Sequence, residues 1–172
     1  GPGIRTTVFF KGCNLKCAWC HNPESQSFNK QIMFYKNKCT GCGRCRDLTV
    51  DDEKFFCFND AKEICGKEYA AEEILKEVIK DKVFYKNSGG GVTISGGEPL
   101  FQSDFTAELL KKCFENGIHT AIETSGFSEE KGFSGVFDNR ISFRDFLYGK
   151  RSLIIGVHRD KERFDLYVFE AV

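Results

Sequence analysis

The sequence predicts an α/β fold whose strands form a parallel sheet. Three observations support it: a short apolar strand before a cysteine-rich loop, two segments with apolar residues at helical spacing, and a strand, helix, strand order in the middle of the chain. Crossover connections between parallel strands are right-handed, so each successive β/α unit is expected to have the same handedness. The formal net charge is zero, which gives no sign of a nucleic-acid or acidic-membrane surface.

The first strand is expected over residues 7–10, an apolar run that leads into the cysteine-rich loop. A helix is expected over residues 72–80, although Ala70 and Ala71 stand where a capping residue is usual. Its apolar residues share one helical face: Ile74, Leu75, Val78 and Ile79.

A second strand is expected over residues 92–95 and a third over residues 119–123. Between them a helix is expected over residues 104–116, with Ser103 as N-cap and Gly117 as its stop. The apolar residues of this helix recur at helical spacing: Phe105, Leu109, Leu110, Cys113 and Phe114. Cys113 is therefore predicted to be a buried core thiol.

Three cysteines, Cys13, Cys17 and Cys20, follow the first strand as Cys-x-x-x-Cys-x-x-Cys. Three thiolates can hold three irons of a cubane cluster, which leaves one iron open to bind a small molecule. A structural zinc loop is the alternative, but zinc favours paired cysteines or spaced histidines, and His21 lies too close to Cys20. A disulfide framework is disfavoured, because the chain has an odd number of cysteines, nine, and they lie at spacings typical of metal ligands.

A second motif, Ser-Gly-Gly-Glu-Pro, follows the strand expected over residues 92–95. Gly96, Gly97 and Glu98 would present backbone groups and a carboxylate at the strand's carboxyl end, where α/β folds bind ligands. A glycine pair after a strand is by itself most often a turn.

Together the two motifs resemble the radical S-adenosylmethionine superfamily. The flanking residues are GPGIRTTVFFKGC at 1–13, WCHNPE at 19–24 and NSGGGVTISGGEP at 87–99. They closely resemble the glycyl-radical-enzyme activating enzymes, the pyruvate formate-lyase activase group, and the likeness extends to about Phe127.

The resemblance implies a partial (β/α)6 barrel of the triosephosphate-isomerase type with a small ferredoxin-like iron-sulfur insert. The chain begins inside the family's opening signature, and the likeness fades after Phe127. A truncated barrel of about three units is therefore expected, with a divergent tail in which residues 164–169 faintly resemble a strand. The implied segments are 1–30 for the first strand and cluster loop, 31–66 for the insert, 67–127 for the barrel units and 128–172 for the tail.

The implied activity is reductive cleavage of S-adenosylmethionine at a 4Fe-4S cluster. The resulting 5′-deoxyadenosyl radical abstracts hydrogen from a backbone glycine of a partner, a glycyl radical enzyme. Flavodoxin or ferredoxin is the implied electron donor, and no side-chain acid or base is needed. The implied cofactor-binding residues are Trp19, Gly96, Gly97, Glu98, Glu123 and Thr124. Two of these residues have an alternative interpretation: Trp19 could equally be a lid on the cluster loop, and Glu123 could be a solvated carboxylate at a strand end. Arg5 is expected to have a structural role.

A second cysteine group, Cys39, Cys42 and Cys45, has the spacing of the first three ligands in bacterial ferredoxins. Thr49 occupies the position of the fourth ferredoxin ligand, so Cys57 is expected to replace that ligand. Cys65 could compete with Cys57 for the same role. The prediction is one auxiliary 4Fe-4S cluster; a zinc knuckle from the same thiolates is the alternative.

Nine cysteines at cluster spacings indicate a reducing compartment, and the expected location is the cytoplasm. Two other functions stay open. One is a different radical S-adenosylmethionine enzyme, such as the anaerobic ribonucleotide reductase activase. The other is an inactive or purely iron-sulfur-binding, electron-transfer fragment.

Overall fold

A computed structural model gives the structure of the chain. It describes residues 2–52, 54–127, 136, 153–160 and 163–170. The chain divides into two compact units, one of Gly1–Phe10 with Tyr69–Val172 and the other of Lys11–Glu68. Within the described ranges, no helix is long and apolar enough to cross a membrane.

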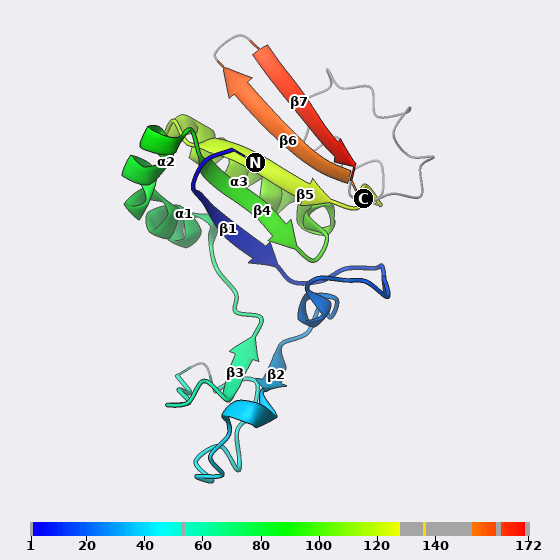
Figure 1. The fold of residues 1–172 in the computed structure, drawn as a ribbon, viewed down its shortest axis with the longest axis vertical. Helices are drawn as coiled ribbons and strands as arrows, with labels where there is room; N and C mark the ends of the chain where they lie inside the picture. The colour runs from blue at the N-terminus through cyan, green and yellow to red at the C-terminus, as the bar shows by residue number, and fades with distance from the viewer. Residues whose placement is uncertain (1, 53, 128–135, 137–152, 161–162, 171–172) are drawn as a thin grey trace. The chain divides into compact units, whose positions relative to one another are not determined.

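A five-stranded sheet in the order β1-β4-β5-β6-β7 forms the centre of the first unit (Figure 1). Its first three strands run parallel: β1 (Arg5–Phe10), β4 (Gly91–Gly96) and β5 (His119–Thr124). The last two are antiparallel to their neighbours: β6 (Leu153–Asp160) and β7 (Arg163–Glu170).

The architecture is thus mixed α/β with a parallel portion, as the order of elements predicts, but a partial (β/α)6 barrel is not confirmed. Only residues 161 and 162 separate β6 from β7, and so short a connection can join antiparallel strands only. The faint strand signal at residues 164–169 falls within β7. Residues 128–135 and 137–152 of the expected tail lie outside the described residues.

Three helices cover one face of the parallel strands (Figure 1): α1 (Ala71–Lys80), α2 (Lys82–Ser88) and α3 (Ser103–Glu115). The Glu73 carboxylate accepts the backbone N–H of Ala70 at 2.8 Å, so α1 is capped from its third residue although an alanine precedes it. Gln102, rather than the expected Ser103, precedes α3 as N-cap.

The core of this unit lies between the helices and the sheet. Val92, Ile94 and Ile122 are fully buried on the helix-covered face of the strands, and burial of each such side chain contributes about 1.5–3 kcal/mol. The helices supply the opposite side of the core, with Leu75, Val78, Tyr85, Leu109 and Cys113. Cys113 is 0% exposed, which confirms the predicted core thiol.

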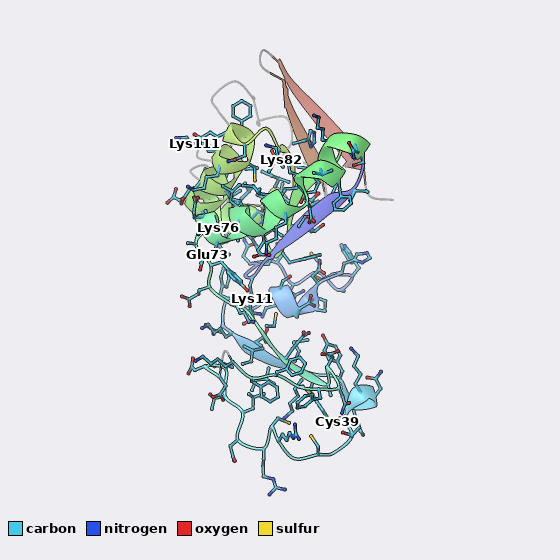
Figure 2. All side chains as sticks on the ribbon, turned by 90° about the vertical axis from the view of Figure 1, so that its left-hand side faces the viewer. Lys11, Cys39, Glu73, Lys76, Lys82 and Lys111 are labelled. Carbon is cyan, nitrogen blue, oxygen red and sulfur yellow. The ribbon has the colours of Figure 1, made fainter. Side chains whose placement is uncertain are left out.

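The second unit is built on a short antiparallel pair, β2 (Gln31–Phe34) and β3 (Lys62–Cys65). Two 3₁₀ turns, Pro23–Ser25 and Lys36–Lys38, precede β2 and follow it. The loop between the two strands carries Cys39, which Figure 2 labels. The cysteine run after β1 belongs to the same compact unit as this loop, whereas the sequence assigns the two to separate segments.

Candidate functional site

The segment after β4 lies against the end of β1. Gly96 has a φ of +99°, and a Cβ there would lie 2.4 Å from the carbonyl oxygen of Phe10. Gly97 donates its backbone N–H to that same oxygen at 2.8 Å. A side chain at Gly96 would therefore clash with the backbone of β1, which explains in steric terms why glycine stands there.

Glu98 follows the glycine pair, and its side chain points inward and is only 1% exposed. Its Oε1 accepts hydrogen bonds from Leu100 N at 3.1 Å and from Thr124 Oγ1 at 2.5 Å. Its Oε2 accepts from Ser125, from the backbone N at 2.8 Å and from Oγ at 2.5 Å. The carboxylate therefore joins the ends of β4 and β5 through internal donors.

Glu123 makes a second link between the same two strands. Its Oε2 accepts a hydrogen bond from Ser95 Oγ at 2.5 Å. Because neighbouring residues of a strand point to opposite faces, the Glu123 and Thr124 links lie on opposite sides of the sheet. Of the five residues predicted at these strand ends, the structure thus joins Glu98 directly to Thr124, places Gly96 and Gly97 against β1, and bonds Glu123 to Ser95 instead.

Ser125 is the residue of this cluster that the sequence analysis missed. It directly follows β5, and both its backbone and its hydroxyl contact Glu98. The only sequence signal was a pair of hydroxyl residues, Thr124 and Ser125, before Gly126 at a strand end.

Arg5 lies at the other end of the parallel strands. Its guanidinium donates to Thr93 Oγ1 at 2.7 Å and to the carbonyl of Val92, and it lies 3.1 Å from His119 Nδ1. Burial lowers the pKa of Arg5, against the opposing effect of Tyr85 and Glu123. These contacts tie β1, β4 and β5 together at their amino ends, in agreement with a structural role.

The loop of Cys13, Cys17 and Cys20 is fixed at its base. Gly12 N donates to Ser25 O at 2.7 Å, and Cys13 N donates to Gln26 O at 3.1 Å. Gly12 has a φ of +105°, and a Cβ there would lie 2.3 Å from the ring of Phe28. The three thiols themselves are half-exposed, and Trp19 between them is 76% exposed.

The donor chemistry of this loop fits an iron-sulfur cluster. Leu15 N donates to Cys13 Sγ at 3.4 Å, and N–H groups directed at cysteine sulfur are one of the means by which proteins tune such clusters. Soft thiolates select iron-sulfur clusters or zinc over hard cations. Within the part of the chain that the structure describes, no three His, Cys, Asp or Glu side chains are grouped closely enough to hold a metal ion.

A cavity of about 270 Å³ lies in the second unit. Three of the four cysteines predicted for the auxiliary site line it, together with aromatic and polar neighbours: Cys42, Cys45, Cys57, Arg44, Phe55, Phe56, Phe58 and Asn59. Backbone N–H groups of Asn59, Lys62 and Ala61 lower the pKa of the Cys57 thiol. Cys65 instead lies in β3, paired with Gln31, and the exposed Cys39 accepts the N–H of Gly41 at 3.5 Å.

Comparison with known proteins gives a family match over most of the chain. The family described as "4Fe-4S single cluster domain" matches residues 1–140. The chain is 41% identical over 158 residues to a trans-4-hydroxy-L-proline dehydratase activating enzyme of Clostridioides difficile. This alignment covers 79% of this chain and 52% of that protein. It is 42% identical over 187 residues to a benzylsuccinate synthase activating enzyme of Thauera aromatica, covering 93% of this chain and 56% of the relative.

A (2S)-3-sulfopropanediol dehydratase activating enzyme of Klebsiella oxytoca is 40% identical over 151 residues. The chain thus spans about half the length of the curated relatives it matches. All three relatives are activating enzymes, as the sequence motifs predict. The chain therefore belongs to the 4Fe-4S single cluster domain family, and the relatives to which it is similar over about half of their length are named as activating enzymes.

Proposed function

We propose that this chain supplies the cluster-binding and S-adenosylmethionine-binding portion of a glycyl-radical-enzyme activating enzyme. One observation carries the proposal: β1 and β4 are adjacent parallel strands in register, with Phe10 opposite Gly96. The cysteine run follows β1 in the sequence, and the Gly-Gly-Glu segment follows β4. Parallel sheets bind ligands at the carboxyl ends of their strands, so both motifs begin where a ligand is expected.

In this proposal Cys13, Cys17 and Cys20 hold a 4Fe-4S cluster, which supplies one electron when bound. The bound cluster would supply the electron for reductive cleavage of S-adenosylmethionine, and the hydrogen atom that the reaction removes would come from a backbone glycine of the partner. The protein's part is to bind, orient and exclude water.

The residues at the ends of β4 and β5 would hold the cofactor. Gly96 and Gly97 bring backbone close to the ligand without a side chain in the way. Glu123 and Thr124 are assigned to the ribose side by the family resemblance, and Trp19 to the adenine.

The proposed partner is a glycyl radical enzyme, in line with the activating-enzyme names of the relatives. A flavodoxin or a ferredoxin is the proposed source of the electron. The cytoplasm is the proposed location, because cluster cysteines need a reducing compartment to stay unoxidised.

The test is anaerobic reconstitution of the 172-residue chain with iron and sulfide, followed by dithionite and S-adenosylmethionine. Chromatography is expected to show 5′-deoxyadenosine for the wild-type chain and none for Cys17→Ala. Lys16→Ala, an exposed change in the same loop, is the matched control and is expected to retain the product. A cluster without nucleoside would contradict cofactor cleavage by this chain and favour an electron-transfer fragment instead.

We also propose that Cys39, Cys42, Cys45 and Cys57 hold an auxiliary 4Fe-4S cluster. The cavity lined by Cys42, Cys45 and Cys57 supports it, because three of the four predicted thiols open onto one space. The family description names a single cluster, so the auxiliary cluster is tested separately, by iron content. Retention of bound zinc instead of iron by these four thiols would favour the zinc knuckle.

A further inference from the structure

Four hydrogen-bond donors converge on the buried carboxylate of Glu98. Two come from Ser125, one from the Thr124 hydroxyl and one from the backbone of Leu100. A carboxylate is an acceptor only, with two oxygens that can each accept more than one hydrogen bond. The side chain is thus engaged by this chain's own groups on both of its oxygens.

The two hydroxyl donors extend this network into the loop after β5. Thr124 Oγ1 accepts the N–H of Gly126 at 3.0 Å, and Ser125 Oγ accepts the N–H of Phe127 at 3.3 Å. Each hydroxyl therefore accepts from the loop and donates to Glu98. One buried carboxylate thereby orders four consecutive residues, 124–127, against the end of β4.

We propose that Glu98 is a positioning residue that fixes loop 124–127, and that Ser125 acts on cofactor binding only through Glu98. This inference rests on the proposed function, since it concerns the same S-adenosylmethionine site. It departs from the expectation that Glu98 binds the cofactor directly, which for a carboxylate would mean contact with the amino group of S-adenosylmethionine. The geometry accounts for a glutamate here: an amide has one acceptor oxygen, so its NH2 group would face the N–H of either Ser125 or Leu100, whereas a carboxylate satisfies both donors.

The first test needs no cofactor. Hydrogen exchange at the Ser125 amide or at the Leu100 amide is expected to accelerate at least about tenfold in Glu98→Gln, because the single glutamine oxygen can accept on only one side. Glu108→Gln, the same change at an exposed helical carboxylate, is the matched control and is expected to leave the exchange rate unchanged. Unchanged exchange rates at both amides in Glu98→Gln would overturn the inference whatever the chain's function.

The second test separates positioning from direct contact by using two ligands. S-adenosylmethionine carries the amino group, whereas 5′-methylthioadenosine lacks the whole amino-acid portion. If Glu98 positions the loop, Glu98→Gln and Ser125→Ala each raise the Kd of the reconstituted chain for both ligands by about tenfold. The double variant then shows less than the product of the two effects, because both changes break one network.

Two results would overturn the positioning role. One is a loss of affinity in Glu98→Gln that is confined to S-adenosylmethionine, with Ser125→Ala unchanged, which is the signature of direct contact with the amino group. The other is failure of Ser125→Thr, which keeps the hydroxyl, to restore binding. A wild-type chain that binds neither ligand but shows the exchange effect would reject the proposed function and leave the Glu98 network established.

Discussion

Replacing Gly96 with alanine probes the contact that holds the end of β4 against β1. Two costs act together. A left-handed backbone costs an L-residue about 1–2 kcal/mol, and the φ of Gly96 is +99°. The new Cβ would also lie 2.4 Å from the carbonyl oxygen and 2.5 Å from the backbone nitrogen of Phe10. Both atoms belong to the backbone of a paired strand, so the clash can be relieved only if that backbone moves. This movement lowers the stability of the fold by about 1–3 kcal/mol more.

Gly117→Ala is the matched control, because it isolates the second cost. Gly117 has a φ of +67° at the end of α3, and a Cβ there would meet nothing within 4 Å. Gly96→Ala is therefore expected to be less stable than Gly117→Ala by about 1–3 kcal/mol. In thermal unfolding followed by circular dichroism this corresponds to a difference in Tm of roughly 5 °C for a chain of this size. Equal losses in the two variants would refute the close approach.

Three further predictions concern single side chains. Burial raises the pKa of the Cys113 thiol from 9.0 to about 11, so the unfolded chain releases this proton first, and the free energy of unfolding falls as the pH rises through that window. In urea unfolding of Cys113→Ala across the same pH range, the free energy of unfolding is expected to fall less steeply with pH than in the wild-type chain. An identical pH dependence in the two chains would contradict the raised pKa. Arg5→Lys loses the guanidinium contacts to Thr93 and His119 and is expected to cost about 2 kcal/mol in urea unfolding. The exposed control Lys111→Ala is expected to stay within about 0.5 kcal/mol, and an Arg5→Lys loss no larger than that would contradict the structural role. Reconstitution is expected to load roughly eight irons on the wild-type chain and about four on Cys57→Ala; removal of all the iron, or of none, would reject Cys57 as an auxiliary ligand.

The elements with buried apolar residues were predictable from the sequence. The three parallel strands and the helices α1 and α3 lie within one or two residues of their expected bounds, because buried strands give short apolar runs and the buried face of a helix imposes a period of 3.6 residues. The short helix α2 was missed, since it follows α1 after the single residue Asp81 and its sequence ends in a glycine-rich run.

The partners that lie far apart in sequence were not predictable. The bond between Glu98 and Ser125 and the pairing of β6 with β5 depend on tertiary contacts that a local period does not record. The sequence motif placed Glu98 at the strand end correctly, but its spacing could not reveal that internal donors surround the carboxylate. The same holds for Arg5, whose contact with His119 joins the first strand to the third.

The most direct test of the central claim is electron paramagnetic resonance of the reduced Cys57→Ala chain before and after S-adenosylmethionine is added. In this variant the cluster on Cys13, Cys17 and Cys20 is expected to be the one that remains. If the open iron of that cluster binds the cofactor, its g-values change on addition, and 5′-methylthioadenosine, which lacks the amino and carboxylate groups, leaves them unchanged. A spectrum that S-adenosylmethionine does not alter would contradict the assignment of a cofactor-binding cluster to this chain.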